Sequence, residues 1–168
     1  GDAYRLQPAN EATMAELLRL TDAIGCQMAL AELLLEKVED IDDADRRREV
    51  HRTIAGLFSG LEGEGVRAVE QYHAVLDIQP DDLAAVDALV SIHRDSQQWA
   101  ELVDILSRKA SLHEPIDEKK ALLIEAGSIA AQQMGDASEA IRAYERVLDL
   151  DPSEMIALNA LSLHYEET

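Results

Sequence analysis

The sequence predicts an all-α protein, an α-solenoid of stacked antiparallel helix pairs with about nine helices. Three observations lead to this prediction. The chain repeats itself, since the stretch 68–89 is closely similar to the stretch 140–161. Its apolar residues recur at i, i+3, i+4 and i+7, the spacing of one side of a helix. Alanine and leucine are abundant and only 4% of residues are aromatic, a composition that suits helix packing better than strands.

The repeat is clearest in AIRAYERVLDLDP at residues 140–152, which nearly copies AVEQYHAVLDIQP at residues 68–80. Of the 22 positions that begin at Ala68, nine are identical to their counterparts in the run that begins at Ala140, without a gap. The repeat unit divides again into two half-units. Leu102, which lies between the two similar stretches, aligns with Ala68 of the first stretch and with Ala140 of the second. A sequence that resembles itself at regular spacings along the chain, as this one does, predicts a solenoid.

Each unit is predicted to hold two helices. Residues 137–150 form one apolar stripe, and Asp151, Pro152 and Glu154 provide a cap, a first-turn proline and a capping-box acid for the next helix. The additional residues of the longer units are expected in turns at 41–45 and 113–117. The predicted helices are 9–21, 24–39, 44–60, 64–78, 81–94, 97–111, 117–133, 137–150 and 153–167.

The whole chain, residues 1–168, is predicted to be a single domain of about four and a half units. The units lie near residues 9–40, 44–80, 81–112, 117–152 and 153–168. Natural arrays close with a polar capping helix, and neither end of this sequence has one. The sequence therefore predicts a fragment cut from a longer array, whose uncapped ends would allow a homo-oligomer to form.

The pattern A-x-x-x-Y-x-x-V-L-x-x-x-P at 68–80 and 140–152 resembles the second helix of a tetratricopeptide repeat. That family has a small residue, an aromatic residue four later and a proline twelve later. Gly56 matches the family's small first-helix residue, and Ser128 is a tolerable substitute. The other two full units match less well, with Leu106 at one aromatic position. The resemblance implies a right-handed superhelix, and related helical-repeat families are a minor alternative.

The charge of the chain bounds its partners. There are 15 Lys and Arg against 34 Asp and Glu, a net charge of −19. Nucleic acid is disfavoured because its binders must neutralise phosphates, and anionic membrane surfaces are disfavoured for the same reason. No stretch is long and apolar enough for membrane insertion. The single cysteine, Cys26, forms no internal disulfide, so the compartment stays undecided, with the cytoplasm slightly favoured.

The sequence predicts no catalytic site, no metal site and no cofactor. The five histidines lack ligand spacing, and His93-Arg94-Asp95 matches a kinase catalytic loop without any of the accompanying motifs. LEGEGVR at 61–67 is interpreted as a helix–helix turn, because a phosphate loop needs a Lys-Ser/Thr ending. The run of acids and arginines at 36–48 is interpreted as a solvated turn and not as a calcium site.

The resemblance implies that the first helices line a concave groove. Its polar residues, mapped by repeat position, are Glu16, Arg19, Thr53, Asp87, Ser91, Arg94, Glu125, Gln132 and Asn159. Some family members bind a C-terminal carboxylate there with lysines and asparagines. Only Asn159 suits that role, so the expected partner is a neutral or basic protein or peptide segment.

The predicted function is therefore a non-catalytic protein–protein interaction scaffold that binds a segment on its concave face. One alternative is a self-assembly module, which forms a homo-oligomer through its faces or ends. Another is a regulatory domain of a larger multidomain protein. An enzyme within these residues is the least favoured interpretation.

Overall fold

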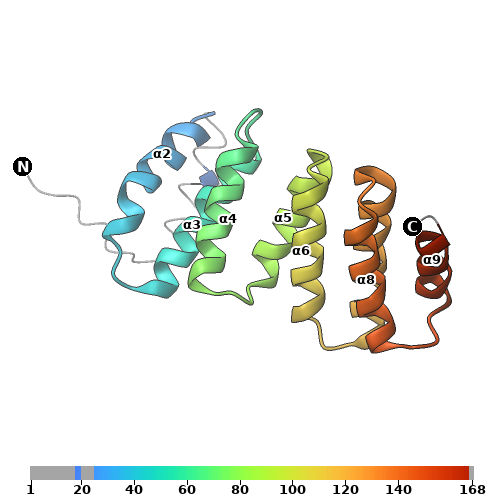
Figure 1. The fold of residues 1–168 in the computed structure, drawn as a ribbon. Coiled ribbons are helices and arrows are strands. Elements are labelled where there is room, and N and C mark those ends of the chain that lie inside the picture. The colour runs from blue at the N-terminus through green and yellow to red at the C-terminus, as the bar shows by residue number, and fades with distance from the viewer. Residues whose placement is uncertain (1–17, 20–24, 167–168) are drawn as a thin grey trace, which may run out of the picture. The chain divides into compact units, whose positions relative to one another are not determined.

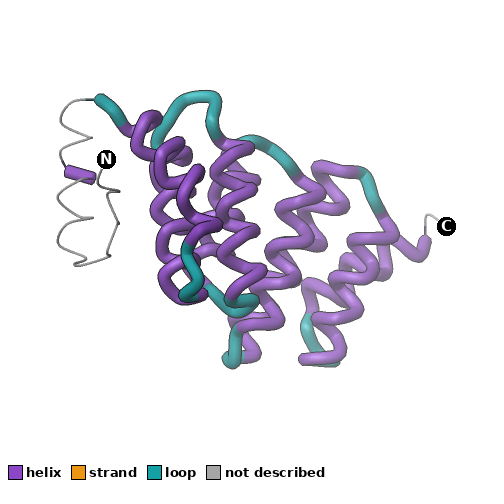
Figure 2. The backbone as a smooth tube through the Cα atoms, turned by 90° about the vertical axis from the view of Figure 1, so that its left-hand side faces the viewer, coloured by secondary structure: helices purple, strands orange, loops and turns teal. Residues whose placement is uncertain are grey.

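The computed structural model describes residues 18–19 and 25–166, and its side chains as far as Leu163. All regular structure in these residues is helical (Figure 2), which confirms the all-α prediction. The α-helices are α2 (Gln27–Lys37), α3 (Ala44–Ser59), α4 (Gly65–Ile78), α5 (Leu83–Asp95), α6 (Trp99–Leu112), α7 (Ile116–Ile129), α8 (Ala137–Leu150) and α9 (Met155–Glu166). A 3₁₀-helix η1 (Val38–Asp40) follows α2, and a π-helix η2 (Ala130–Met134) follows α7.

Eight α-helices are thus described where nine were predicted. The helix predicted at 9–21 lies outside the described residues, apart from Leu18 and Arg19, which are helical. The other eight appear where the sequence placed them, with bounds that differ by a few residues. The predicted unit boundaries and the single-domain prediction stay predictions.

The chain forms two compact units, residues 1–71 and 72–168. In the first unit α2 packs against α3. In the second unit each helix packs against the next, in the order α5, α6, α7, α8 and α9 (Figure 1). Consecutive packing is what short connections between antiparallel helices favour.

A left-handed backbone conformation recurs with the period of the sequence repeat. Gly25, Gly63, Gln97 and Gly135 have φ values of 70°, 86°, 55° and 65°. The sequence repeat places Gly25 on Gln97 and Gly63 on Gly135, so the four occupy equivalent positions. Each lies shortly before the second helix of a pair begins, at α2, α4, α6 or α8. Glycine adopts this conformation without steric cost, so three of the four turns have the expected residue.

Turns lie at 41–43 and 113–115, within the two predicted segments 41–45 and 113–117, but they are no longer than the turns at 79–82 and 151–154. The helices α3 and α7 begin at Ala44 and Ile116, within these two segments. The helix α3, the first of its predicted pair, has 16 residues, whereas the corresponding helix α5 of a shorter unit has 13. The start of α3 at Ala44, which is the predicted one, has a local cause, because the carboxylate of Asp43 accepts a 2.8 Å hydrogen bond from the backbone N–H of Arg46.

The core of the second unit shows close contact between α7 and α8. The Tyr144 side chain is buried, and burial raises the pKa of its phenol. Its ring lies against Gly127, where a Cβ would stand only 2.9 Å from Cε1 and Cζ. The resemblance matched Ser128 with the family's small first-helix residue, whereas the small residue that contacts Tyr144 is its neighbour Gly127.

In the first unit, too, the small residue that faces inward is the neighbour of the one matched by the resemblance. Ala55 is fully buried, whereas Gly56 is exposed and has open space around it. The inward small residue is therefore Ala55 and not Gly56. In this unit the guanidinium of Arg67 lies 4.1 Å from the ring centroid of buried Phe58, a cation–π contact that joins α4 to α3.

Candidate interaction surface

Three of the residues assigned to the groove share one exposed side of α5. Asp87, Ser91 and Arg94 are spaced by four and three residues, so they project from the same side of the helix. All three are exposed. Together with Glu125 of α7 they form a set that we call the α5–α7 stripe.

Ion pairs connect this stripe to neighbouring helices. Arg94 of α5 and Glu125 of α7 form a pair with an N–O distance of 2.5 Å, which links two first helices. The carboxylate of Asp87 lies 2.7 Å from Nζ of Lys109, on the second helix α6. The Arg94 and Glu125 side chains are 48% and 40% exposed, so the pair is screened and contributes about 0.2–1 kcal/mol.

These pairs change the electrostatics expected for the surface. In the sequence, Asp87 and Glu125 are two acids of the predicted groove. In the structure each acid has a cation beside it, so Asp87, Lys109, Arg94 and Glu125 together carry no net charge. These four side chains therefore give the surface no excess of negative charge. Lys109 was missed because nothing in the sequence indicates which residue of α6 reaches α5.

The remaining predicted groove residues lie elsewhere or have other partners. Glu16 lies outside the described residues, and Arg19 is exposed. Thr53 belongs to the first unit, and its hydroxyl donates to the carbonyl of Glu49 on its own helix. Gln132 is exposed in η2, and Asn159 is exposed on α9. The structure thus brings together only four of the nine residues, all in the second unit.

A cluster centred on a partly buried lysine holds the turn between α8 and α9. Lys120 Nζ lies 2.8 Å from a carboxylate oxygen of Asp151, 3.1 Å from Glu154 and 3.6 Å from Asp117. Hydrogen bonds to Asp151 and then Glu154 raise the pKa of Lys120. The bond from Lys120, followed by those from Ser153, lowers the pKa of Asp151 to about 2. This cluster anchors α7 to the turn between α8 and α9.

The cluster has a sequence signal that could have identified it. The repeat places Asp117 and Lys120 on Asp45 and Arg48, which form the same i,i+3 ion pair in the first unit, with an N–O distance of 3.0 Å. Both pairs lie in the first turns of the longer first helices. A cation repeated at this place predicts an anchoring role for these turns.

The two buried histidines of the described residues have structural partners. His51 is buried on α3, and its Nδ1 lies 2.8 Å from the amide oxygen of Gln71 on α4. His93 is also buried, and its Nδ1 lies 2.8 Å from the amide oxygen of Gln98. Since an amide oxygen only accepts, both Nδ1 atoms carry hydrogen. The neighbouring Arg94 takes part in the ion pair described above, so His93-Arg94-Asp95 has structural contacts.

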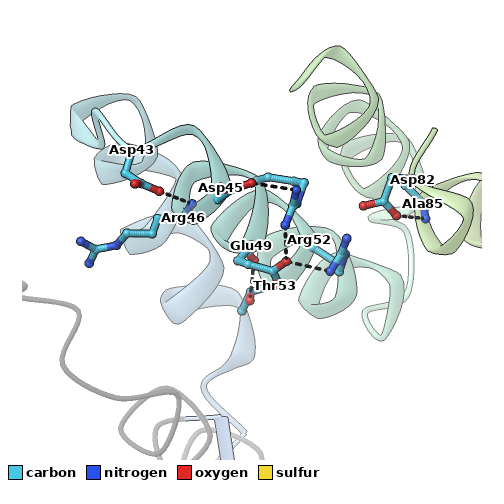
Figure 3. Close-up of polar contacts among 9 residues, drawn as sticks. Asp43, Asp45, Arg46, Glu49, Arg52, Thr53, Asp82 and Ala85 are labelled. Atoms are coloured by element: carbon cyan, nitrogen blue, oxygen red, sulfur yellow. Dashed lines mark hydrogen bonds and ion pairs between the residues drawn. The ribbon is translucent and has the colours of Figure 1, made fainter. Parts of the chain in front are cut away.

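The charged run at the start of α3 forms local contacts on the helix surface. Figure 3 shows the Asp43 cap and the pair between Glu49 and Arg52, whose N–O distance is 2.9 Å. Arg48 pairs with both Asp45 and Glu49. Within the described part of the chain, no group of three or more His, Cys, Asp or Glu residues is arranged to hold a metal ion.

The segment LEGEGVR forms the turn between α3 and α4, as predicted, with Gly63 at its left-handed position. None of the described helices is both long enough and apolar enough to cross a membrane. Comparison of the sequence with protein-family models and with curated proteins finds no match.

Proposed function

We propose that this chain is a non-catalytic protein–protein interaction module that binds a neutral peptide or protein segment along the α5–α7 stripe. The observation that carries the proposal is the Arg94–Glu125 pair, which joins two first helices on their exposed side. A segment lying across both helices would meet polar side chains that are already oriented, and orientation before binding reduces its entropic cost.

This proposal includes the architecture inferred from the sequence. It takes the helix pairs to be stacked as an α-solenoid with the right-handed superhelix of tetratricopeptide repeats. The recurrence of left-handed residues at equivalent positions of the sequence repeat supports this interpretation, because it implies the same turn in each pair. A regulatory role within a larger protein would use the same binding surface.

The test uses a charge swap that keeps the ion pair. A phage-displayed library of unstructured peptides is selected on the wild-type chain, and the enriched peptides are synthesised. Their dissociation constants are then measured on the double variant Arg94→Glu with Glu125→Arg. Because the pair is preserved in reverse, the fold should persist while the pattern presented to the ligand is inverted. We expect affinity to fall by about tenfold or more.

The matched control is the swap Glu139→Arg with Arg142→Glu on α8. These two residues also form an ion pair, but within a single helix, at i,i+3 spacing. Peptides that bind the wild type and this control equally, and bind the stripe swap weakly, support the proposal. Equal binding to all three proteins would reject the stripe as the site.

Self-assembly is a second candidate, and exposed apolar residues on α9 favour it. Sedimentation velocity over a hundredfold range of concentration tests it. A mass that increases with concentration supports self-assembly, and a constant monomer mass rejects it.

A further inference from the structure

The second unit exposes few large apolar side chains outside α9. Among the residues of α5 to α8, Leu83 and Ile116 are the two of this kind, with exposed fractions of 42% and 54%. Each is the first residue of its helix, α5 or α7. Met155, the first residue of α9, is 62% exposed. An exposed apolar residue therefore recurs at the beginning of three helices.

These three helices begin at the same edge of the second unit. The turns that precede them lie along the lower edge of this unit in Figure 1. Side chains of the helices in between connect these turns. Arg108, near the end of α6, donates a 2.8 Å hydrogen bond to the carbonyl of Pro80, and Lys120 of α7 donates one of 2.8 Å to the carboxylate of Asp151. The exposed apolar residues thus share one edge.

The same edge carries an excess of acids. The segments 77–84, 112–120 and 149–155, which we call the acidic edge, hold nine acids and two lysines. One of these lysines, Lys120, is already paired with Asp151. A purely apolar partner would leave this excess of negative charge unmatched, whereas lysine or arginine side chains would complement it.

Charge also decides between the possible occupants. A second copy of the chain would bring another net charge of −19, and two such edges would repel each other. Exposed acids stand beside the apolar residues, because Asp81 precedes Leu83 by two residues and Glu114 precedes Ile116 by two. A ligand that covers these apolar side chains therefore needs positive charge next to its own apolar residues.

We propose that the acidic edge binds a basic segment of a partner protein, in which lysine or arginine residues alternate with apolar ones. The apolar residues of this segment cover Leu83, Ile116 and Met155, and its cations lie beside Asp81 and Glu114. Apolar burial supplies affinity, and the charges supply specificity and a faster encounter. The acidic edge contains no residue of the α5–α7 stripe, so the inference does not rest on the proposed function.

The test measures binding of a synthetic peptide to the full chain. A fluorescein-labelled peptide that repeats Lys-Leu-Lys-Ser three times is titrated with the chain, and its fluorescence anisotropy is followed. We expect saturable binding that weakens as salt is added, because salt screens exposed charges. Two matched peptides separate the contributions, one with serine in place of every leucine and one with glutamate in place of every lysine. Both should bind about tenfold more weakly or worse.

Two double variants locate the site. Leu83→Ser with Ile116→Ser removes two apolar contacts and should raise the dissociation constant of the Lys-Leu-Lys-Ser peptide by about tenfold or more. Asp81→Asn with Glu114→Gln removes two charges, so it should raise the dissociation constant and reduce its dependence on salt. All four side chains are exposed, so the fold should persist, and circular dichroism checks this.

Matched controls make similar changes elsewhere. Asp95→Asn with Asp104→Asn removes two exposed charges of the second unit outside the acidic edge, and Leu33→Ser on α2 changes a side chain that is 51% exposed. Both should keep the dissociation constant within about twofold of the wild-type value. The stripe swap, Arg94→Glu with Glu125→Arg, should do the same, so this result is independent of the proposed function.

Four results would overturn the proposal. The first is the absence of saturable binding to the wild-type chain. The second is equal binding of the peptide without leucine, because the apolar residues would then contribute nothing. The third is binding that the two edge variants leave unchanged or that the stripe swap abolishes. The fourth is a wild-type dimer in sedimentation equilibrium that Leu83→Ser with Ile116→Ser dissociates and that the peptide does not displace, because the occupant would then be a second copy.

Discussion

The ring of Tyr144 on α8 lies directly against Gly127 on α7, at a distance that leaves no room for a side chain. A Cβ at Gly127 would stand 2.9 Å from two ring atoms. The two helices pack closely at this point because one of them has no side chain and the other has a large flat one.

This contact predicts that Gly127→Ala destabilises the protein. Overpacking costs about 1–3 kcal/mol, and the gain in helix propensity offsets about 1 kcal/mol of that. In a Tyr144→Ala background the clash is absent, so the same change should stabilise. Urea unfolding of the four proteins of this cycle measures both signs. Gly56→Ala is the control, because Gly56 lies in open space in the last turn of α3 and the change should stabilise by up to about 1 kcal/mol. Equal effects of Gly127→Ala in both backgrounds would contradict the contact.

The left-handed residue Gln97 predicts a stabilising change. Its φ of 55° is costly for a residue with a Cβ, and Gly occupies the equivalent position in the other three turns. Gln97→Gly should raise the free energy of unfolding by about 0.5–1 kcal/mol, after the entropy cost of glycine is included. Gln133→Gly in η2 is the control and should destabilise. A loss of stability in Gln97→Gly would show that the turn does not require this conformation.

The Lys120 cluster predicts how stability depends on pH. The pKa of Asp151 is lowered to about 2 from 3.8, so its contribution is present above about pH 4 and is lost as the pH falls through 2. Lys120→Met removes the hydrogen-bond donor, and the pKa of Asp151 should rise toward 3.8. Carboxyl-carbon NMR titration measures this value. Lys119→Met, the same change at the adjacent residue, should leave it low. A low value in Lys120→Met would assign the shift to Ser153 alone.

The buried pair of His51 and Gln71 predicts a non-additive cost. Gln71→Leu leaves a buried imidazole N–H without its acceptor, which costs about 1–3 kcal/mol. The double variant His51→Phe with Gln71→Leu removes both polar groups and should recover most of that loss. Thermal unfolding followed by circular dichroism compares the variants. A double variant that is less stable than Gln71→Leu would show that the histidine contributes more than this hydrogen bond.

The local pattern of the sequence determined the helices and their repetition. Apolar stripes, caps such as Asp43 and turn glycines such as Gly135 act within a few residues, so their effects can be predicted from the chain alone. The exposed side of α5 was also predictable, because the spacing of Asp87, Ser91 and Arg94 fixes their common direction.

The tertiary structure decided which of these residues meet. Lys109 neutralises Asp87, and Arg94 neutralises Glu125, because packing brings α6 and α7 within reach of α5. It also decided that Gly127 and not Ser128 meets Tyr144, because the sequence alone does not show which of two adjacent small residues faces the neighbouring helix. Partners of this kind stand on different helices, far apart along the chain, and only the packed arrangement of helices brings them together.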